Sequence, residues 1–316
     1  MIRGSACAKV IVCGEHAVVY GAPAIAVPLP QVRVTVTLRP GAAGSGPTFS
    51  SPQAASDGLA ATFGPWLRQV AAHVGTSADV CCAIDSAVPI ASGMGSGAAL
   101  ATALVRALAA AAGRDADPAL VAELVAVSEQ ALHGTPSGID QTVIAREQPI
   151  WFRRGAAPGD APTIEPLVIA RPLTLVIGDT GERSPTRQMV TAVRQLRATA
   201  PMLVEAAFAA IGAATLQARV ALQDGDQALL GRCLDACHDA LATIGVSCAA
   251  LDRLVCAARA AGASGAKLAG AGGGGVMIAL APAPDAAAAI AAAVRRAGAA
   301  TVLVAPVAAT AGATIP

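Results

Sequence analysis

A run of glycines that leads directly into a helix is the first feature of this sequence that could carry chemistry. The letters Gly-Met-Gly-Ser-Gly occupy positions 93–97, and the alanine-rich stretch 98–112 that follows is strongly helical. Glycines let a backbone approach a ligand closely, and the first turn of a helix offers unpaired N–H groups at the positive end of its dipole. The pattern predicts a polyphosphate site. A glycine turn without a ligand is its plainer alternative.

The same glycines also fit the dinucleotide-binding pattern Gly93-x-Gly95-x-x-Ala98, which is typical of oxidoreductases. Two observations count against that interpretation. The glycines lie deep in the chain instead of in an opening β-α-β unit, and the helix runs into a second helix without an obvious strand between them. A Walker-type Gly-Lys-Ser/Thr sequence does not occur in the chain.

Glu129 falls on an apolar helix face, because Val121, Val125 and Leu132 share its helical stripe. Burying a carboxylate without a partner costs several kcal/mol, so a cation should accompany it. Beside a phosphate loop that cation is expected to be Mg²⁺. A structural salt bridge to an arginine is the alternative.

Asp140 and Lys9 could act directly on a substrate hydroxyl. Asp140 ends the segment 133–140, whose glycines and proline predict a tight turn. A carboxylate on such a turn could accept a proton during phosphoryl transfer, or could simply be a turn residue. Lys9 lies in an apolar strand, where it could stabilise a transferring phosphoryl group or, as an edge-strand lysine, reach solvent. His133 is expected to be structural.

The sequence predicts an α+β protein with two lobes and a large core. It has 316 residues, 54% hydrophobic and 14% charged, which excludes a disordered chain. The pattern predicts strands at 6–13, 31–38, 80–84, 149–152, 173–177, 276–280 and 301–304. It predicts helices at 98–112, from Pro118 (capped by Asp117) to 133, and at 185–198, 202–223, 227–244, 249–261 and 285–296. The stretch 41–57 is expected to be a loop, and 155–166 to contain the lobe boundary, which divides the chain into domains 1–160 and 161–316.

The composition also limits which partners and which cellular location we expect for the protein. A net charge of +1 and 2% aromatic residues give no basic field and no stacking platform, which argues against nucleic acid. Neither a membrane span nor a signal peptide is evident, so we expect a cytoplasmic protein without a membrane partner. The eight cysteines are expected to be reduced. Cys233, Cys237 and His238 resemble a metal site only in spacing, since no second ligand pair follows.

Taken together, these segments resemble the GHMP kinase superfamily along nearly the whole chain. The stretch 9–21, which ends Gly-Glu-His-Ala-Val-Val-Tyr-Gly, is similar to the branch that phosphorylates the C5 hydroxyl of (R)-mevalonate in isoprenoid biosynthesis. Positions 89–100, 133–140 and 265–275 resemble the family's phosphate loop, catalytic-aspartate segment and C-terminal glycine motif. The resemblance implies an N-terminal ribosomal-S5-like nucleotide-binding lobe and a C-terminal ferredoxin-like lobe.

The resemblance also implies roles for individual residues, with ATP and Mg²⁺ as cofactors and mevalonate as substrate. Lys9 and Asp140 would be catalytic, and Glu129 and Ser96 would hold the metal. The expected ATP-binding residues are Pro89, Gly93, Met94, Gly95, Ser96, Gly97 and Ala98. The expected substrate-binding residues are Glu15, His16, Arg154, Thr186, Gly272 and Gly273, with Arg153 a further candidate for the substrate carboxylate. A homodimer is possible.

Two positions depart from the family pattern. Many relatives have a second serine where this chain has Gly97, so Ser96 or water would have to complete the metal shell. Glu147-Gln148 stands where relatives often have paired glycines. The alternatives are therefore a sibling kinase acting on a phosphorylated or sugar alcohol and a nucleotide-binding regulator without catalysis.

Overall fold

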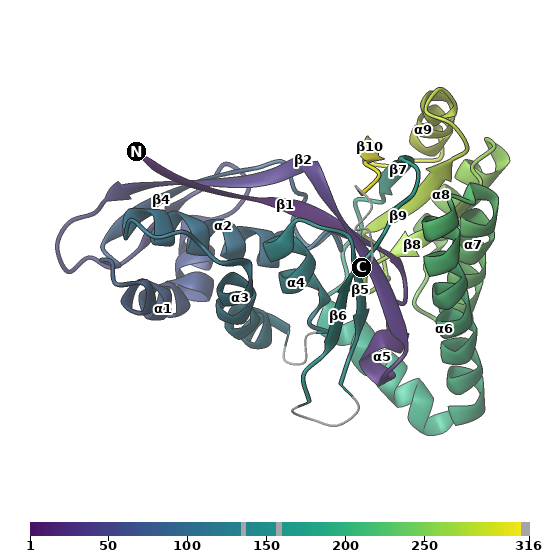
Figure 1. Ribbon diagram of the computed structural model, residues 1–316, viewed down its shortest axis with the longest axis horizontal. Helices are drawn as coiled ribbons and strands as arrows, with labels where there is room; N and C mark the ends of the chain where they lie inside the picture. Colours follow the sequence, from purple (N-terminus) through teal and green to yellow (C-terminus); the bar gives the residue numbers. More distant parts are fainter. Residues whose placement is uncertain (134–136, 156–159, 311–316) are drawn as a thin grey trace, which may run out of the picture. The chain divides into compact units, whose positions relative to one another are not determined.

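The computed structural model describes residues 1–133, 137–155 and 160–310 (Figure 1). Two compact units can be distinguished. Unit 1 contains Met1–Lys9, Pro30–Ile90 and Gly95–Glu147, and unit 2 contains Val10–Leu29, Ala91–Met94 and Gln148–Pro316. Strands β1 (Ile2–Cys13) and β2 (Pro23–Pro40) therefore pass from one unit into the other. The predicted division at residue 160 remains a prediction.

Unit 1 combines strands with a layer of helices. Residues 34–40 of β2 pair antiparallel with β4 (Val80–Ser86), and β3 (Thr48–Ser50) pairs parallel with β4. The strands alternate buried and exposed side chains, which shows that one face of the sheet meets the core. Helices α1 (Ser56–Val74), α2 (Ser96–Ala111), α3 (Pro118–His133) and α4 (Ile139–Arg146) lie together on one side of these strands (Figure 1).

Unit 2 is built on an antiparallel four-stranded sheet in the order β10-β7-β9-β8. Its strands are β7 (Leu173–Asp179), β8 (Gly265–Ala269), β9 (Val276–Ala281) and β10 (Thr301–Val307). Helices α7 (Gln227–Thr243), α8 (Ala249–Ala260) and α9 (Ala286–Arg296) contact this sheet. Strand β9 is buried throughout, as expected for a central strand covered by helices.

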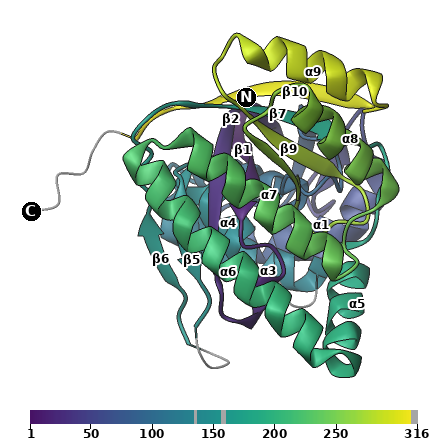
Figure 2. The ribbon, with the colours of Figure 1, turned by 90° about the vertical axis from the view of Figure 1, so that its right-hand side faces the viewer.

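The rest of unit 2 includes a hairpin and two further helices. Residues 23–26 of β2 pair with β5 (Ile150–Arg153), which pairs with β6 (Thr163–Pro166). Helix α5 (Thr186–Thr199) precedes α6 (Pro201–Asp224), and α6 runs alongside α7 (Figure 2). Among the described residues only α6 is long and apolar enough to cross a membrane. Its Val204, Phe208 and Ile211 are buried within the unit, as in the core helix of a globular domain.

Most predicted elements are confirmed, and α+β is the observed class. Asp117 caps α3 as predicted, because its Oδ2 accepts a hydrogen bond from Leu120 N at 3.2 Å. Five of the described strands and α-helices were not predicted, namely β3, α1, α4, β6 and β8, and β3 corrects the expectation of a loop over 41–57. Helix α1 contains Gly64 and Pro65, which usually break helices, yet it buries Phe63, Trp66 and Leu67. Tertiary packing outweighs local propensity there. Strands β6 and β8 are short.

Candidate active site

Lys9 and Asp140 meet in unit 1. Lys9 lies on β1, and its Nζ is 3.2 Å from Asp140 Oδ1. The Lys9 side chain is almost fully buried, whereas about a quarter of the Asp140 side chain is exposed. An edge-strand lysine that reaches solvent is therefore wrong for Lys9. The pair presents one buried cation and one accessible carboxylate, the arrangement needed to hold a hydroxyl group and take its proton.

The position of Asp140 corrects the predicted turn. Asp140 lies in the first turn of α4, which begins at Ile139, and Gly138 before it has φ 94°. A carboxylate is favourable at that end of a helix dipole. The turn was predicted from the glycines and the proline of segment 133–140. Positions 134–136 and the side chain of His133 lie outside the described residues.

Glu129 is buried on α3 beside the Lys9–Asp140 pair. Its side chain and those of Val121 and Val125 are buried, as the helical stripe predicts. Burial, together with the negative charge of Asp140, raises the pKa of Glu129 to about 8, although Lys9 lowers it in part. An environment with two neighbouring carboxylates and one lysine favours an added cation. Carboxylate and hydroxyl oxygens are the donors that Mg²⁺ prefers, so Glu129 and Asp140 fit such an ion.

In the loop 93–97, the backbone angle and the close neighbours of Gly95 explain why that position is glycine. Gly95 is the N-cap of α2 with φ 76°, a conformation that favours glycine. A Cβ on Gly95 would lie 2.9 Å from Ile144 Cδ1 and 3.1 Å from Lys9 Cε. The missing side chain thus leaves room for the Lys9 side chain. Ser96 and Gly97 are the first two residues of α2, followed by buried Ala98, and their N–H groups belong to the helix start.

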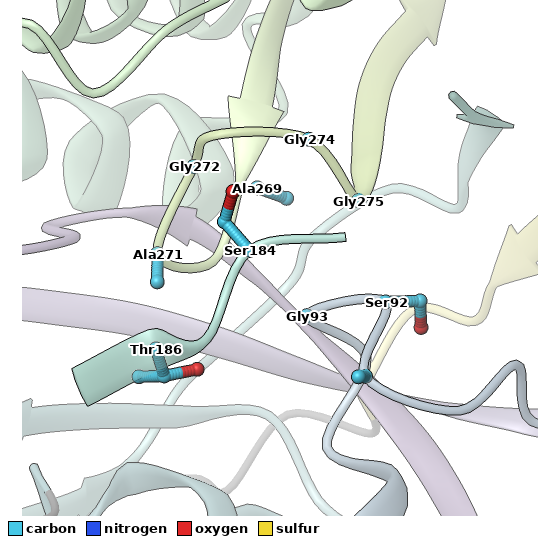
Figure 3. Close-up of a pocket in the computed structure, with 10 residues that line it drawn as sticks. Ser92, Gly93, Ser184, Thr186, Ala269, Ala271, Gly272, Gly274 and Gly275 are labelled. Atoms are coloured by element: carbon cyan, nitrogen blue, oxygen red, sulfur yellow. The ribbon is translucent and has the colours of Figure 1, made fainter. Parts of the chain in front are cut away.

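A pocket of about 250 Å³, counting the solvent at its mouth, lies within unit 2 (Figure 3). Three segments far apart in the sequence meet there: residues 91–93, Ser184 with Thr186, and the loop after β8. The pocket brings together three of the predicted residues, namely Gly93, Thr186 and Gly272. Thr186 begins α5. Ser184 was not singled out from the sequence, because a lone serine before a helix carries no distinctive signal.

The glycine loop 270–275 that lines this pocket is tightly packed. Gly273 N donates to Val246 O at 2.8 Å, and Gly275 N donates to Glu182 O at 2.9 Å. A Cβ on Gly272 would lie 2.0 Å from Val246 O, and Gly272 has φ 81°. These contacts hold the loop against its neighbours, so it is not a flexible surface loop. They also explain why only glycine fits at these positions.

Glu15 and His16 are both buried in unit 2, beside the glycine loop. His16 Nε2 lies 2.9 Å from the carbonyl oxygen of Ala271, a residue that lines the pocket. Glu15 forms an ion pair with Lys267, a residue that sequence reasoning did not identify. Its sequence signal was a lysine in an apolar stretch, the same signal that identified Lys9.

Other predicted residues are placed more simply. Pro89 belongs to unit 1 and Met94, fully buried, to unit 2. Arg154 is partly exposed and directly follows β5, and Arg153, the last residue of β5, donates from its Nε to Gly21 O at 3.1 Å. Cys237 is hydrogen-bonded to Cys13 within the core, and this bond together with burial raises the pKa of Cys13. His238 Nδ1 accepts from Leu268 N at 3.3 Å.

The fold and the site define a class of protein, and comparison with known families identifies it. Residues 62–148 match the N-terminal domain of the GHMP kinases and residues 218–300 match their C-terminal domain. The chain belongs to the GHMP kinase family. It is 34% identical to the mevalonate kinase of Aeropyrum pernix and 33% identical to that of Thermococcus gammatolerans. The first alignment covers 85% of both chains, and the second covers 85% of this chain and 86% of the relative.

A solved structure agrees with these relatives. The crystal structure of L. major mevalonate kinase in complex with R-mevalonate superposes with a TM-score of 0.85 at 28% identity. The match covers 98% of this chain and 97% of the other.

Proposed function

We propose that this protein catalyses the ATP-dependent phosphorylation of the C5 hydroxyl of (R)-mevalonate, giving 5-phosphomevalonate. Relatives that cover 85% of the chain at about one-third identity are mevalonate kinases. The observation that carries the proposal is the pairing of buried Lys9 with accessible Asp140, which the family resemblance had marked as catalytic. We expect the protein to act in isoprenoid biosynthesis and to be cytoplasmic.

In this proposal the chain's own residues orient the hydroxyl and take its proton. Asp140 accepts the proton as the oxygen attacks, and the Lys9 ammonium, held by Asp140, stabilises the charge that develops on the transferring group. Bound Mg·ATP supplies the phosphoryl group and neutralises part of its charge. Glu129 and Ser96 would hold the metal. The N–H groups at the start of α2 would bind phosphate oxygens together with the loop residues 93–95.

On the substrate side we assign residues of unit 2. His16, Thr186, Gly272 and Gly273 would contact mevalonate, because the first adjoins Ala271 and the others lie in or next to the pocket. Arg154 would bind the carboxylate. A homodimer stays part of the proposal.

A coupled assay for ADP release tests the function. Purified protein is incubated with ATP, Mg²⁺ and a panel of alcohols that includes mevalonate, 5-phosphomevalonate and galactose. We expect turnover with mevalonate at least 100-fold faster than with the others, and a product whose mass increases by one phosphate. Preference for 5-phosphomevalonate would instead indicate a sibling kinase. ADP release that does not depend on any alcohol would contradict the proposal.

A further inference from the structure

Unit 2 contains an ion pair that is fully removed from solvent. Lys267, on β8, has no exposed surface, and Glu15 is 2% exposed. Lys267 Nζ donates to Glu15 Oε1 and also to Leu268 O at 2.6 Å. The second oxygen, Glu15 Oε2, is buried and has no hydrogen-bond partner among the described residues. The pair is therefore incompletely satisfied.

A buried ion pair of this kind is not expected to add much to the stability of the fold. Removing two charges from water costs about as much as their attraction returns, and apolar residues of similar volume are often equally stable or more so. An oxygen left without a partner adds to the cost. The contacts around the pair suggest what else it does.

Glu15 is joined to a strained residue at the pocket. His16 has φ 58° and ψ −52°, values that a non-glycine residue rarely adopts. The conformation places its ring Nε2 2.9 Å from Ala271 O. Burial lowers the pKa of His16, although the bond to Ala271 opposes this shift, so the neutral ring donates its Nε2–H at neutral pH.

Lys267 is joined to the same loop from the other side. Strand β8 ends at Ala269, two residues after Lys267, and runs directly into the glycine loop. The ion pair thus connects two segments 252 residues apart in the sequence, each of which contributes one partner of the His16–Ala271 hydrogen bond. A pair held in this place fixes the distance between the turn at His16 and the loop.

We propose that Lys267 and Glu15 are positioning residues, whose buried ion pair holds His16 against Ala271 and so shapes the pocket that receives the alcohol substrate. This inference rests on the proposed function for its kinetic readout. Glu15 then acts on the substrate through His16 instead of touching it. Loss of the pair raises the KM for mevalonate while leaving the KM for ATP within about threefold of the parent value.

The experiment separates positioning from stability. Lys267→Met leaves Glu15 buried without a cation, and we expect it to lose both stability and activity. The double variant Lys267→Met/Glu15→Leu removes both charges, and we expect its Tm to lie within a few degrees of the parent. Its KM for mevalonate should rise at least tenfold. Amide hydrogen exchange at Gly273, Gly275 and Val276 should accelerate at least tenfold, since these N–H groups are bonded in the parent.

One control changes Lys267 conservatively, and the other removes a different ion pair of unit 2. Lys267→Arg keeps the charge and should recover most of the mevalonate affinity. Glu165→Gln removes an ion pair with Arg219 that is partly exposed in the same unit, and it should leave KM and exchange unchanged.

Two outcomes overturn the proposal. A double variant with parent KM and parent exchange rates would show that the pair is dispensable, and a double variant that cannot fold would show that the pair serves stability alone. If the parent protein itself fails to phosphorylate mevalonate, the proposed function fails. The exchange measurement then still decides whether the pair orders the loop.

Discussion

At the scale of single residues, Asp140 is the group whose chemistry can be separated most cleanly from binding. Asp140→Asn keeps the size of the side chain but cannot accept a proton as a carboxylate does. We expect turnover to fall roughly 100-fold or more, with ATP affinity nearly unchanged. Steady-state kinetics and nucleotide titration check this. Parent-like turnover would remove Asp140 from the mechanism.

Glu129 tests whether a metal belongs in unit 1. Glu129→Gln keeps a similar shape but cannot offer a carboxylate to the ion. We expect the Mg²⁺ concentration for half-maximal rate to rise roughly tenfold, because the ion loses a charged ligand. A magnesium titration of initial rates measures this. An unmoved midpoint would favour a purely structural role for the carboxylate beside Lys9 and Asp140.

A substitution at Gly97 tests whether the proposed metal site is complete without the second serine that many relatives have. Because Gly97 is the second residue of α2, serine can adopt its backbone angles. If Ser96 or water already completes the metal shell, Gly97→Ser will turn over within a few-fold of the parent, which is our expectation. A sharp gain over a feeble parent would show that a ligand was missing. Loss of ATP binding would mean that the phosphates approach the Gly97 backbone closely.

Residue types pointed to the charged residues that meet in unit 1 better than to the residues of the pocket. Lys9 and Glu129 could be singled out because a charge among apolar neighbours needs an explanation. Lys267 gives the same signal, but it was not singled out because the segment 265–275 was interpreted only as a glycine motif. Ser184 has no signal at all, since its role depends on Gly273 O, to which it donates at 2.7 Å from 89 residues away. Partnerships over such separations cannot be read from spacing.

At the scale of elements, Glu147 shows what replaces the paired glycines of relatives. It ends α4 with φ 49° and accepts hydrogen bonds from Arg33 on β2 and Arg106 on α2. Burial alone would raise the pKa of Glu147, but these arginines outweigh it and lower the pKa below its ordinary value. The carboxylate therefore ties a strand and two helices of unit 1 together.

A prediction about pH follows from that shift. A lowered pKa in the folded state means that the stabilisation is fully present above the unfolded value of about 4.3 and is lost as pH falls through the folded value. Glu147→Gln should reduce the free energy of unfolding at pH 7 by about 1–3 kcal/mol. The difference from the parent should shrink below about pH 4. Urea unfolding across pH 3–7 measures this, and a gap independent of pH would contradict it.

Helices and strands could be predicted where an apolar pattern repeats over many residues. The prediction failed where packing against the rest of the fold determines the local structure. Helices α6 to α9 have long apolar stripes, and two of them have a side-chain cap. Asp226 caps α7 by accepting from Leu229 N at 2.9 Å, and Asp285 caps α9 by accepting from Ala286 N at 3.0 Å. Helix α1 was missed because Gly64-Pro65 imitates a break. Helix α4 was missed because Gly138 and Pro136 predicted a turn, and the helix begins directly after them.

At the scale of the whole molecule, neither unit is a continuous piece of chain. Residues 161–316 lack Val10–Leu29 and Ala91–Met94, which belong to unit 2. We expect a fragment 161–316 to show no cooperative thermal unfolding, because β6 loses its β5 partner and Lys267 loses Glu15. Circular dichroism on heating checks this against the full chain. A sharp transition in the fragment would show that the domain division at residue 160 is also a folding boundary.

The strands that pass from unit 1 into unit 2 also determine when each unit can be completed during synthesis. All of unit 1 has been made once residue 147 is added. The ion pair of Glu15 in unit 2 cannot form until Lys267 has also been made. At 5–20 residues per second, those 120 further residues (267 − 147) take roughly 6–24 s. For most of that interval the buried residues 10–13 lack C-terminal partners such as Cys237, which bonds to Cys13, whereas residues 24–26 can pair with β5 once residue 153 has been made. The nascent chain therefore exposes a hydrophobic segment near its N-terminus, to which a ribosome-associated chaperone would bind, until its last quarter emerges.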